Sequence, residues 1–289
     1  RILIMIATLA LTLICVPTPA VLYSLAAPAV AVQGVELSEA VKMFDDLLKS
    51  KEPDSAARAI AAMDDFLVRF RGIENEIAAI DDSVDIGEGD VKHLLFERKG
   101  KVKDLSTIAT TVYNCFVHKA RKTVNEDNLN MWKAAAYTLG QMGENGGRYL
   151  LKAFDLKKFS KEPELRGLFV EQVGYTHAYQ AFGSELIDLL DHSEYLFIAK
   201  ASDALAQFGE APGKVRKEAI ERISKLLAQN YESTISNKTD EEAQKKYRMT
   251  GRAMQNALEA LAGVSLDGPL EWTTWWNKNK NDAELWGEK

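Results

Sequence analysis

A short internal repeat constrains the fold of this chain more than any other feature of its sequence. The segment WKAAAYTLGQMGE, which begins at Trp132, matches the segment AKASDALAQFGE, which begins at Ala199. The match pairs Leu139 with Leu205 and Gly143 with Gly209. Each copy is alanine-rich, amphipathic at helical spacing and followed by glycine. A single pair of such helices buries too little apolar surface to be stable, so the repeat predicts a stack of antiparallel helix pairs.

Apolar residues recur at helical spacing almost continuously from Glu36 onward. In the first half of the chain we expect one helix pair that ends at Gly72, followed by a short helix over residues 73–80. The polar, glycine-rich stretch DDSVDIGEGD, residues 81–90, is typical of a loop. Two further helices are predicted after it, over residues 91–98 and 104–124.

In the second half of the chain we expect a long helix from Pro163 to Gly183, a polar loop over residues 232–242 and a helix capped by Asp240. Glycines are the expected helix stops. Alternating patterns typical of β-strands are absent at useful length. The predicted fold class is therefore all-α, as an α-solenoid of stacked antiparallel helix pairs, with helix stops at Gly143, Gly183, Gly209 and Gly263.

The first 31 residues have the layout of an export signal. A basic residue, Arg1, precedes an apolar run, and small residues follow, including an A-x-A site at Ala29 to Ala31. We therefore expect cleavage after Ala31 and an exported protein of the periplasm or cell envelope, without stable membrane insertion after cleavage. A retained anchor is the alternative, but Pro17 and Pro19 would break a single spanning helix.

Charge and cysteine content limit the function classes. The chain carries 36 Lys and Arg against 42 Asp and Glu, a net charge of −6, without a long run of one sign. A nucleic-acid partner is therefore not expected, because phosphate binding requires a concentrated basic surface. Once the signal is removed, Cys115 is the remaining cysteine; a buried, small apolar residue is favoured over a nucleophile.

The C-terminal part of the chain carries a family resemblance. The A-x-x-A-L-x-x-x-G endings resemble HEAT and HEAT-like repeats, and the segment NALEALAGVSLDGPLEWTTWWNKNK is similar to the closing segment of exported HEAT-repeat proteins of planctomycete-type bacteria. Ala262 replaces a threonine common in that segment. The resemblance implies a protein-binding scaffold without chemistry of its own. Its residues are Ala257, Leu258, Leu261, Gly263, Asp267, Trp272, Trp275, Trp276 and Asn279.

This resemblance divides the predicted mature chain in two. Residues 32–130 are expected to form irregular helix pairs, and residues 131–289 to form HEAT-like repeats closed by a Trp-rich helix. Trp272, Trp275 and Trp276 stand at i, i+3 and i+4, so they share one helical face. We expect them to cap the open end of the last repeat. An aromatic surface for a carbohydrate or a cationic ligand is the alternative.

Motifs that carry chemistry are missing from the sequence. The four histidines never occur at i, i+4 with one another, and no H-E-x-x-H, C-x-x-C, serine elbow or phosphate-binding loop is present. Asp81, Ser83 and Asp85 alternate as in a calcium loop, but Ile86 and Lys92 stand where an EF-hand needs glycine and glutamate. We therefore expect no metal, no cofactor and no enzymatic activity.

Two hypotheses for function follow. The first is a non-catalytic scaffold that binds a protein partner along a groove of successive helices, with tyrosine or tryptophan anchors. The alternative is a helical ligand-binding protein or HEAT-like lyase, with a pocket near Tyr175, His177 and Tyr179, whose polar tips interrupt an apolar helix. His192, in an expected turn after Asp191, is either a solvated turn residue or part of a ligand surface.

Overall fold

The protein is all-helical, as predicted. The computed structural model describes residues 34–87 and 90–287, and this part of the chain contains eleven α-helices, three short 3-10 helices and no strand. The predicted export signal, residues 1–31, lies outside the described residues. The helices are α1 Leu37–Lys49, α2 Ser55–Asp85, α3 Val91–Val117, α4 Glu126–Gly140, α5 Gly143–Phe154, α6 Pro163–Gly174, α7 Tyr179–Asp188, α8 Tyr195–Ala206, α9 Gly213–Ser236, α10 Glu241–Ala262 and α11 Pro269–Asn279.

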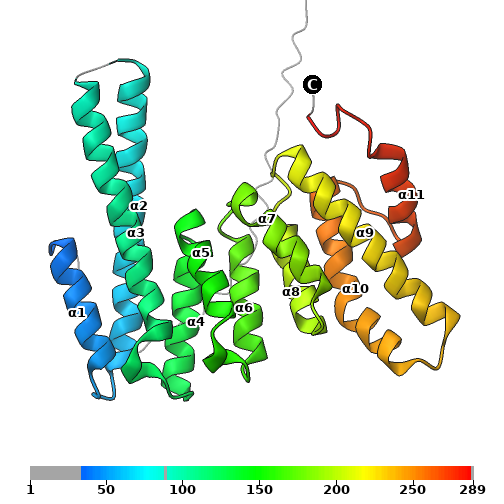
Figure 1. The fold of residues 1–289 in the computed structure, drawn as a ribbon, viewed down its shortest axis with the longest axis horizontal. Helices are drawn as coiled ribbons and strands as arrows, with labels where there is room; N and C mark the ends of the chain where they lie inside the picture. Colours follow the sequence, from blue (N-terminus) through cyan, green and yellow to red (C-terminus); the bar gives the residue numbers. More distant parts are fainter. Residues whose placement is uncertain (1–33, 88–89, 288–289) are drawn as a thin grey trace, which may run out of the picture.

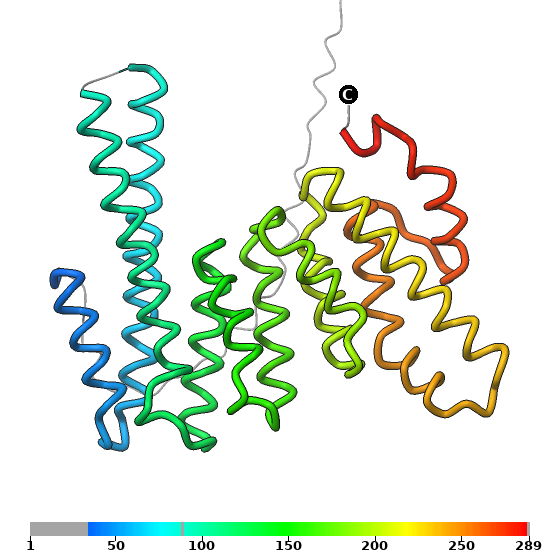
Figure 2. The backbone as a smooth tube through the Cα atoms, viewed as in Figure 1, coloured from blue at the N-terminus to red at the C-terminus, as the bar shows by residue number. Residues whose placement is uncertain are grey.

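The helices pack mainly against near neighbours in the chain (Figure 1). Helices α2, α4, α6, α8 and α10 contact one another in succession, and we call them the even row. Helices α3, α5 and α9 lie beside this row, each against the even helix next to it in sequence. The Cα trace of Figure 2 follows the same progression from the N-terminal to the C-terminal helices. The apolar core is continuous between them, from Phe44 on α1 to Trp272 on α11.

A recurring close contact sets the spacing of the even row. A Cβ atom added at Gly140 would lie 2.6 Å from the Gln172 side chain on α6, and one at Gly174 would lie 2.6 Å from Cα of Ala204 on α8. One at Gly209 would lie 2.9 Å from the carbonyl oxygen of Ala260 on α10. These glycines allow the backbones of successive even helices to approach closely.

One of the expected helix stops is wrong, because Gly183 lies inside α7. Helix α4 ends at Gly140, and Gly143, with a φ of 54°, makes the turn into α5. Gly263 ends α10 in the left-handed conformation, as expected of a C-terminal glycine.

Helices α2 and α3 form a long antiparallel arm that projects beyond the other helices (Figure 1). The predicted breaks at Gly72 and over residues 81–85 are wrong, because α2 is helical without interruption for 31 residues. The two helices predicted over 91–98 and 104–124 are one, α3. Ion pairs across the arm, Arg98 with Asp81 and Lys101 with Glu76, stabilise the two helices against each other. Polar composition alone therefore indicated a longer loop than the chain has.

The helix predicted from Pro163 to Gly183 is two helices. Helix α6 ends at Gly174, and Tyr175 to Ala178 turn the chain into α7. His177 has a φ of 52°, and its N–H donates to the carbonyl of Gly174 at 3.2 Å. The Thr176 hydroxyl donates to the carbonyl of Val173 at 2.7 Å. These local hydrogen bonds use the carbonyls at the end of α6 and end the helix.

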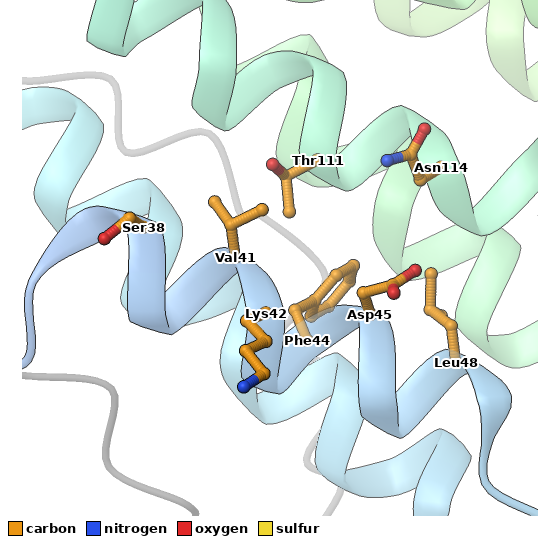
Figure 3. A pocket seen from close by; sticks show the side chains of 8 residues that line it. All are labelled: Ser38, Val41, Lys42, Phe44, Asp45, Leu48, Thr111 and Asn114. Carbon is orange, nitrogen blue, oxygen red and sulfur yellow. The ribbon is translucent and has the colours of Figure 1, made fainter.

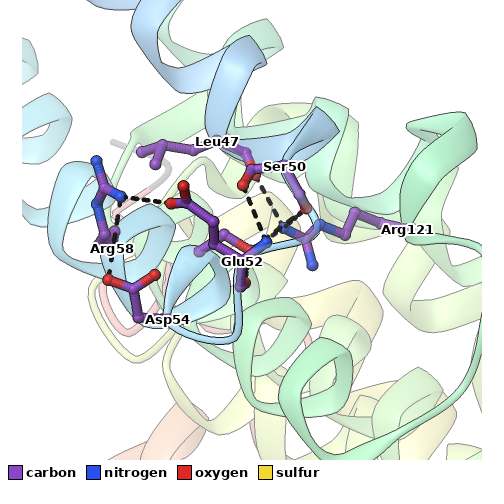
Figure 4. A network of polar contacts seen from close by, with 7 residues as sticks. Leu47, Ser50, Glu52, Asp54, Arg58 and Arg121 are labelled. Carbon is purple, nitrogen blue, oxygen red and sulfur yellow. Dashed lines mark hydrogen bonds and ion pairs between the residues drawn. The ribbon is translucent and has the colours of Figure 1, made fainter.

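Near the base of the arm, one guanidinium group ties α1 to α2 (Figure 4). Arg121, in a 3-10 turn after α3, donates to the carbonyls of Leu47, Leu48 and Ser50 at 2.8–3.2 Å and to the hydroxyl of Ser55 at 2.7 Å. The last carbonyls of α1 have no partner within their own helix, so Arg121 satisfies them. The connection between the first two helices is thereby fixed.

Asp240 caps α10 as predicted, since its carboxylate accepts from the N–H of Ala243 at 3.0 Å. The loop before it is shorter than expected, because α9 continues to Ser236. Helix α4 begins at Glu126, fewer than two turns before the aligned segment starts at Trp132, after an N-cap at Asn125.

Candidate functional site

The histidine and tyrosines of the segment VGYTHAYQAFG separate onto two surfaces. His177 lies in the turn between α6 and α7, where its Nδ1 is 3.2 Å from the hydroxyl of Tyr179. Both residues line an open hollow of ≈ 260 Å³ together with Glu144 and Pro212. Tyr175 does not line this hollow and instead lies at the end of α6, on the face of the even row.

His192 lies at the opposite end of α7 from His177, after the 3-10 turn that follows this helix. Its ring packs edge-on against Phe197, with centroids 4.8 Å apart, and its Nδ1 accepts from the N–H of Glu194 at 2.9 Å. These contacts are those of a residue that organises a turn. The structure therefore does not bring His192 together with Tyr175, His177 and Tyr179.

The most distinctive surface is built by residues of α4, α6 and α8. Tyr137 on α4 and Tyr175 at the end of α6 are 48% and 43% exposed, and the two phenols lie close enough to interact electrostatically. Glu171 on α6 and Lys200 on α8 form an ion pair with Nζ to Oε2 at 2.6 Å. We call these residues, together with Asp203 on α8, the tyrosine–carboxylate site.

Charge within the tyrosine–carboxylate site is poorly balanced. The Asp203 carboxylate lies 3.9 Å from the Lys200 ammonium, which donates its short hydrogen bond to Glu171 instead. Burial raises the pKa of Asp203, and Glu171 adds to this rise, while Lys200 opposes it. Burial lowers the pKa of Lys200, but the hydrogen bond to Glu171 and the nearby carboxylates outweigh this, so the net shift is upward. Burial also raises the pKa of the Tyr175 phenol, and the charges of Glu171 and Asp203 add to it.

The sequence prediction included Tyr175 in a different group and missed the other four residues of the site. The repeat contained the necessary signal, because its alignment places Tyr137 and Asp203 at corresponding positions of the two copies. Corresponding positions in the copies of a helical repeat are expected to project from the same face of the stack. Glu171 and Tyr175 stand one turn apart on the helix between them.

A second hollow, of ≈ 300 Å³, lies between α1 and α3 (Figure 3). Val41, Phe44 and Leu48 form its apolar side, and the polar groups around it come mainly from Lys42, Asp45, Thr111 and Asn114. The Asp45 carboxylate is 3.6 Å from Nε2 of His118 at the end of α3. Lys42 and Asp45 stand one turn apart on the same helix, α1. The polar side chains around this hollow therefore come from two helices, α1 and α3.

The C-terminal tryptophans make one aromatic cluster. Trp272 and Trp276 are buried, and Trp275 is partly buried against the core. Trp286, which is not among the predicted capping tryptophans, is also buried. Its ring centroid is 6.2 Å from that of Trp275 and 6.1 Å from that of Trp276. Its indole N–H donates to the carbonyl of Asn279 at 2.8 Å. The chain after α11 therefore folds back onto the tryptophan face.

Groups suited to metal or nucleophilic chemistry do not gather in the described part of the chain. No cluster of three or more His, Cys, Asp or Glu side chains there has the geometry to hold a metal ion. Cys115 is fully buried, and burial strongly raises the pKa of its thiol, which disfavours the thiolate. Among the described helices, none has an apolar stretch long enough to cross a membrane.

Comparisons with known proteins add no family. No protein-family model matches the sequence, and neither the curated proteins nor the solved structures include a significant match.

Proposed function

We propose that this chain is a HEAT-like α-solenoid scaffold that binds another protein along the face of α4, α6 and α8 and performs no chemistry of its own. The succession of contacts along the even row supports the solenoid. So do the close contacts at Gly140, Gly174 and Gly209, each of which joins the end of one even helix to the next. Repeat proteins of this kind use extended faces of successive helices for binding.

The observation that carries the proposal is the pair of exposed tyrosines on neighbouring even helices. Tyr137 and Tyr175 each keep nearly half of their surface exposed although they stand beside a closely packed helix row. Tyrosine is enriched among residues that dominate interface energies, because it offers a large rigid ring and a polar hydroxyl. A protein partner that covers both rings would bury apolar surface and satisfy both hydroxyls.

The proposed partner is a protein rather than a nucleic acid, since the chain is acidic overall and the site contains more carboxylates than ammonium groups. We retain the expectation that binding takes place in the exported space, in the periplasm or cell envelope. The predicted signal over residues 1–31 supports this location.

The alternative, a ligand-binding or lyase pocket at His177, has less support. The hollow beside His177 is open, and the imidazole contacts the Tyr179 hydroxyl instead of a carboxylate that would tune it for proton transfer.

Affinity capture with matched variants tests the proposal. The full chain, a variant with Tyr137→Ala and Tyr175→Ala, and a control with Phe96→Ala would be used to capture proteins from envelope extract of the source cells. Phe96 is 79% exposed on the arm, far along α3 from the proposed face. We expect one stoichiometric partner with the parent chain and the control, and at least about a tenfold lower yield with the double variant. Equal capture by all three chains would contradict the proposed face.

A further inference from the structure

The tyrosine–carboxylate site also indicates which chemistry its partner presents. We infer that it binds a basic side chain, Arg or Lys, of a partner protein segment that lies across α4, α6 and α8. This inference rests on the proposed function, because it specifies the partner for the same face.

The tyrosine–carboxylate site is complementary in charge to a basic side chain. Glu164, Glu171 and Asp203 all act on the single ammonium of Lys200. Lys200 donates to Glu171 at 2.6 Å and leaves Asp203 at 3.9 Å, outside hydrogen-bond distance. No hydrogen bond to the Asp203 carboxylate is present within the described residues. A second cation beside Asp203 would supply the hydrogen-bond donor that this half-buried carboxylate lacks.

The site also offers partly exposed tyrosine rings beside its carboxylates. Gly174 packs directly against Ala204, which brings their chain neighbours Tyr175 and Asp203 close together. The charges of Glu171 and Asp203 accordingly raise the pKa of the Tyr175 phenol. Arg and Lys carry an apolar stem and a charged end group. The stem can pack on a tyrosine ring, and the charged group gains from the ring face and from the carboxylates. An anionic or purely apolar segment would leave Asp203 with the 3.9 Å contact to Lys200 and would bring no charged hydrogen-bond donor to it.

The groups of the site are spread across three helices. Three adjacent parallel helices contribute the groups, with Tyr137 on α4, Glu171 and Tyr175 on α6, and Lys200 and Asp203 on α8. A segment that reaches all of them has to cross the helices rather than lie along one. An extended segment suits this direction, because it can point a basic side chain toward the tyrosine–carboxylate site while its backbone continues across α4, α6 and α8.

Titration with short peptides tests the inference without the natural partner. The probes are acetylated, amidated peptides of sequence GRGRG, GQGQG and GEGEG, added to the full chain labelled on its tyrosine rings for NMR. Tyr137→Phe and Tyr175→Phe variants assign the two signals. We expect the arginine peptide to shift both signals in a saturable way, at least about tenfold more tightly than the glutamine peptide.

Matched variants separate the site from a general charge effect. Glu171→Gln with Asp203→Asn should weaken the arginine peptide by at least about tenfold. Glu185→Gln with Asp188→Asn on α7 removes the same charge from another helix and should leave binding unchanged. The inference is overturned if both double variants bind alike, if the glutamate peptide binds as well as the arginine peptide, or if the tyrosine signals do not move. If a partner is still captured through Tyr137 and Tyr175 in that case, the scaffold stands and only the basic recognition fails.

Discussion

Asp203 is the residue at which the proposed function conflicts most clearly with stability. Its carboxylate is half-buried, and its pKa is raised by burial and by Glu171. An aspartate with a raised folded-state pKa holds its proton more tightly when folded. The stability it contributes is present at acid pH and is lost as the pH rises through the folded-state pKa. At neutral pH the charged side chain therefore destabilises the fold, as binding residues often do.

Asp203→Asn should raise the free energy of unfolding at pH 7 by a few tenths of a kcal/mol, up to about 1 kcal/mol, because the site is half-exposed and solvent screens it. The gain should shrink as the pH falls below the ordinary range of aspartate. Urea denaturation at pH 7 and pH 3.5 measures both values. Glu185→Gln, on an exposed position of α7, is the control and should change little. A loss of stability for Asp203→Asn at pH 7 would show that its contact with Lys200 outweighs the cost of burial.

In contrast to Asp203, Arg121 stabilises the fold, since its guanidinium satisfies four acceptors at the connection of α1 and α2. Arg121→Met should lower the free energy of unfolding by about 2–4 kcal/mol, because several part-buried acceptors lose their donors. Arg121→Lys should not restore it, since an ammonium group cannot reproduce the planar fork. Chemical denaturation measures the change. Arg148→Met, which removes an exposed pair with Glu144, should cost less than about 0.5 kcal/mol; equal costs would contradict the assigned role.

At the scale of single residues, the sequence indicated which residues are buried or cap a helix, but not which functional residues lie together in space. Helical spacing indicated which residues are buried, and Asp240 could be recognised as a cap from its neighbours. The separation of Tyr175 from His177 could not be predicted, because it depends on a turn made by the left-handed backbone of His177. A left-handed turn usually contains glycine, but here the left-handed residue is a histidine. The sequence therefore gives no glycine signal at the turn between α6 and α7.

At the scale of helices, glycines have two different roles in this chain. Gly174 allows α6 to approach the backbone of α8, whereas Gly72 stands in the exposed middle of α2, where an added Cβ would meet no atom within 4 Å. The sequence predicts a helix end at Gly72 and a helix that continues through Gly174, and both predictions are wrong. Whether a glycine ends a helix or allows another helix to approach closely depends on the neighbouring helix, which the local sequence does not reveal.

Alanine at these two glycines should have opposite effects. Gly174→Ala should destabilise the protein by about 2–3 kcal/mol, because the new methyl group would overlap backbone atoms of Ala204 that cannot move alone. Gly72→Ala should stabilise it by about 0.5–1 kcal/mol through helix propensity. Thermal and urea denaturation of the two variants provides the comparison. The close packing of α6 on α8 would be contradicted if Gly174→Ala were neutral.

At the scale of the whole molecule, stability should be local, because most contacts join helices that are near in sequence. The C-terminal end is closed by Trp286, whose neighbours include Arg216 on α9 as well as Trp275 and Trp276. In the proposed solenoid, damage at one end should weaken nearby helices more than distant ones.

Trp286→Ala should therefore increase hydrogen exchange in α9, α10 and α11 while leaving α4 and α5 protected. The loss of a buried tryptophan costs about 3–5 kcal/mol locally. Hydrogen exchange measured by mass spectrometry on the full chain gives the profile, and Leu270→Ala, at an exposed position of α11, is the control. A uniform loss of protection from α1 to α11 would indicate one cooperative unit instead of a stack of nearest neighbours.

The central claim is that the face of α4, α6 and α8 binds a protein, and site-specific photo-crosslinking tests it most directly. A photoreactive phenylalanine at position 137 or 175, or at the control positions 96 and 185, would be introduced into the full chain, which is then irradiated in envelope extract. We predict one crosslinked protein from positions 137 and 175 and none from the controls. Crosslinks at positions 96 or 185 without any at 137 or 175 would place the binding surface elsewhere and contradict the claim.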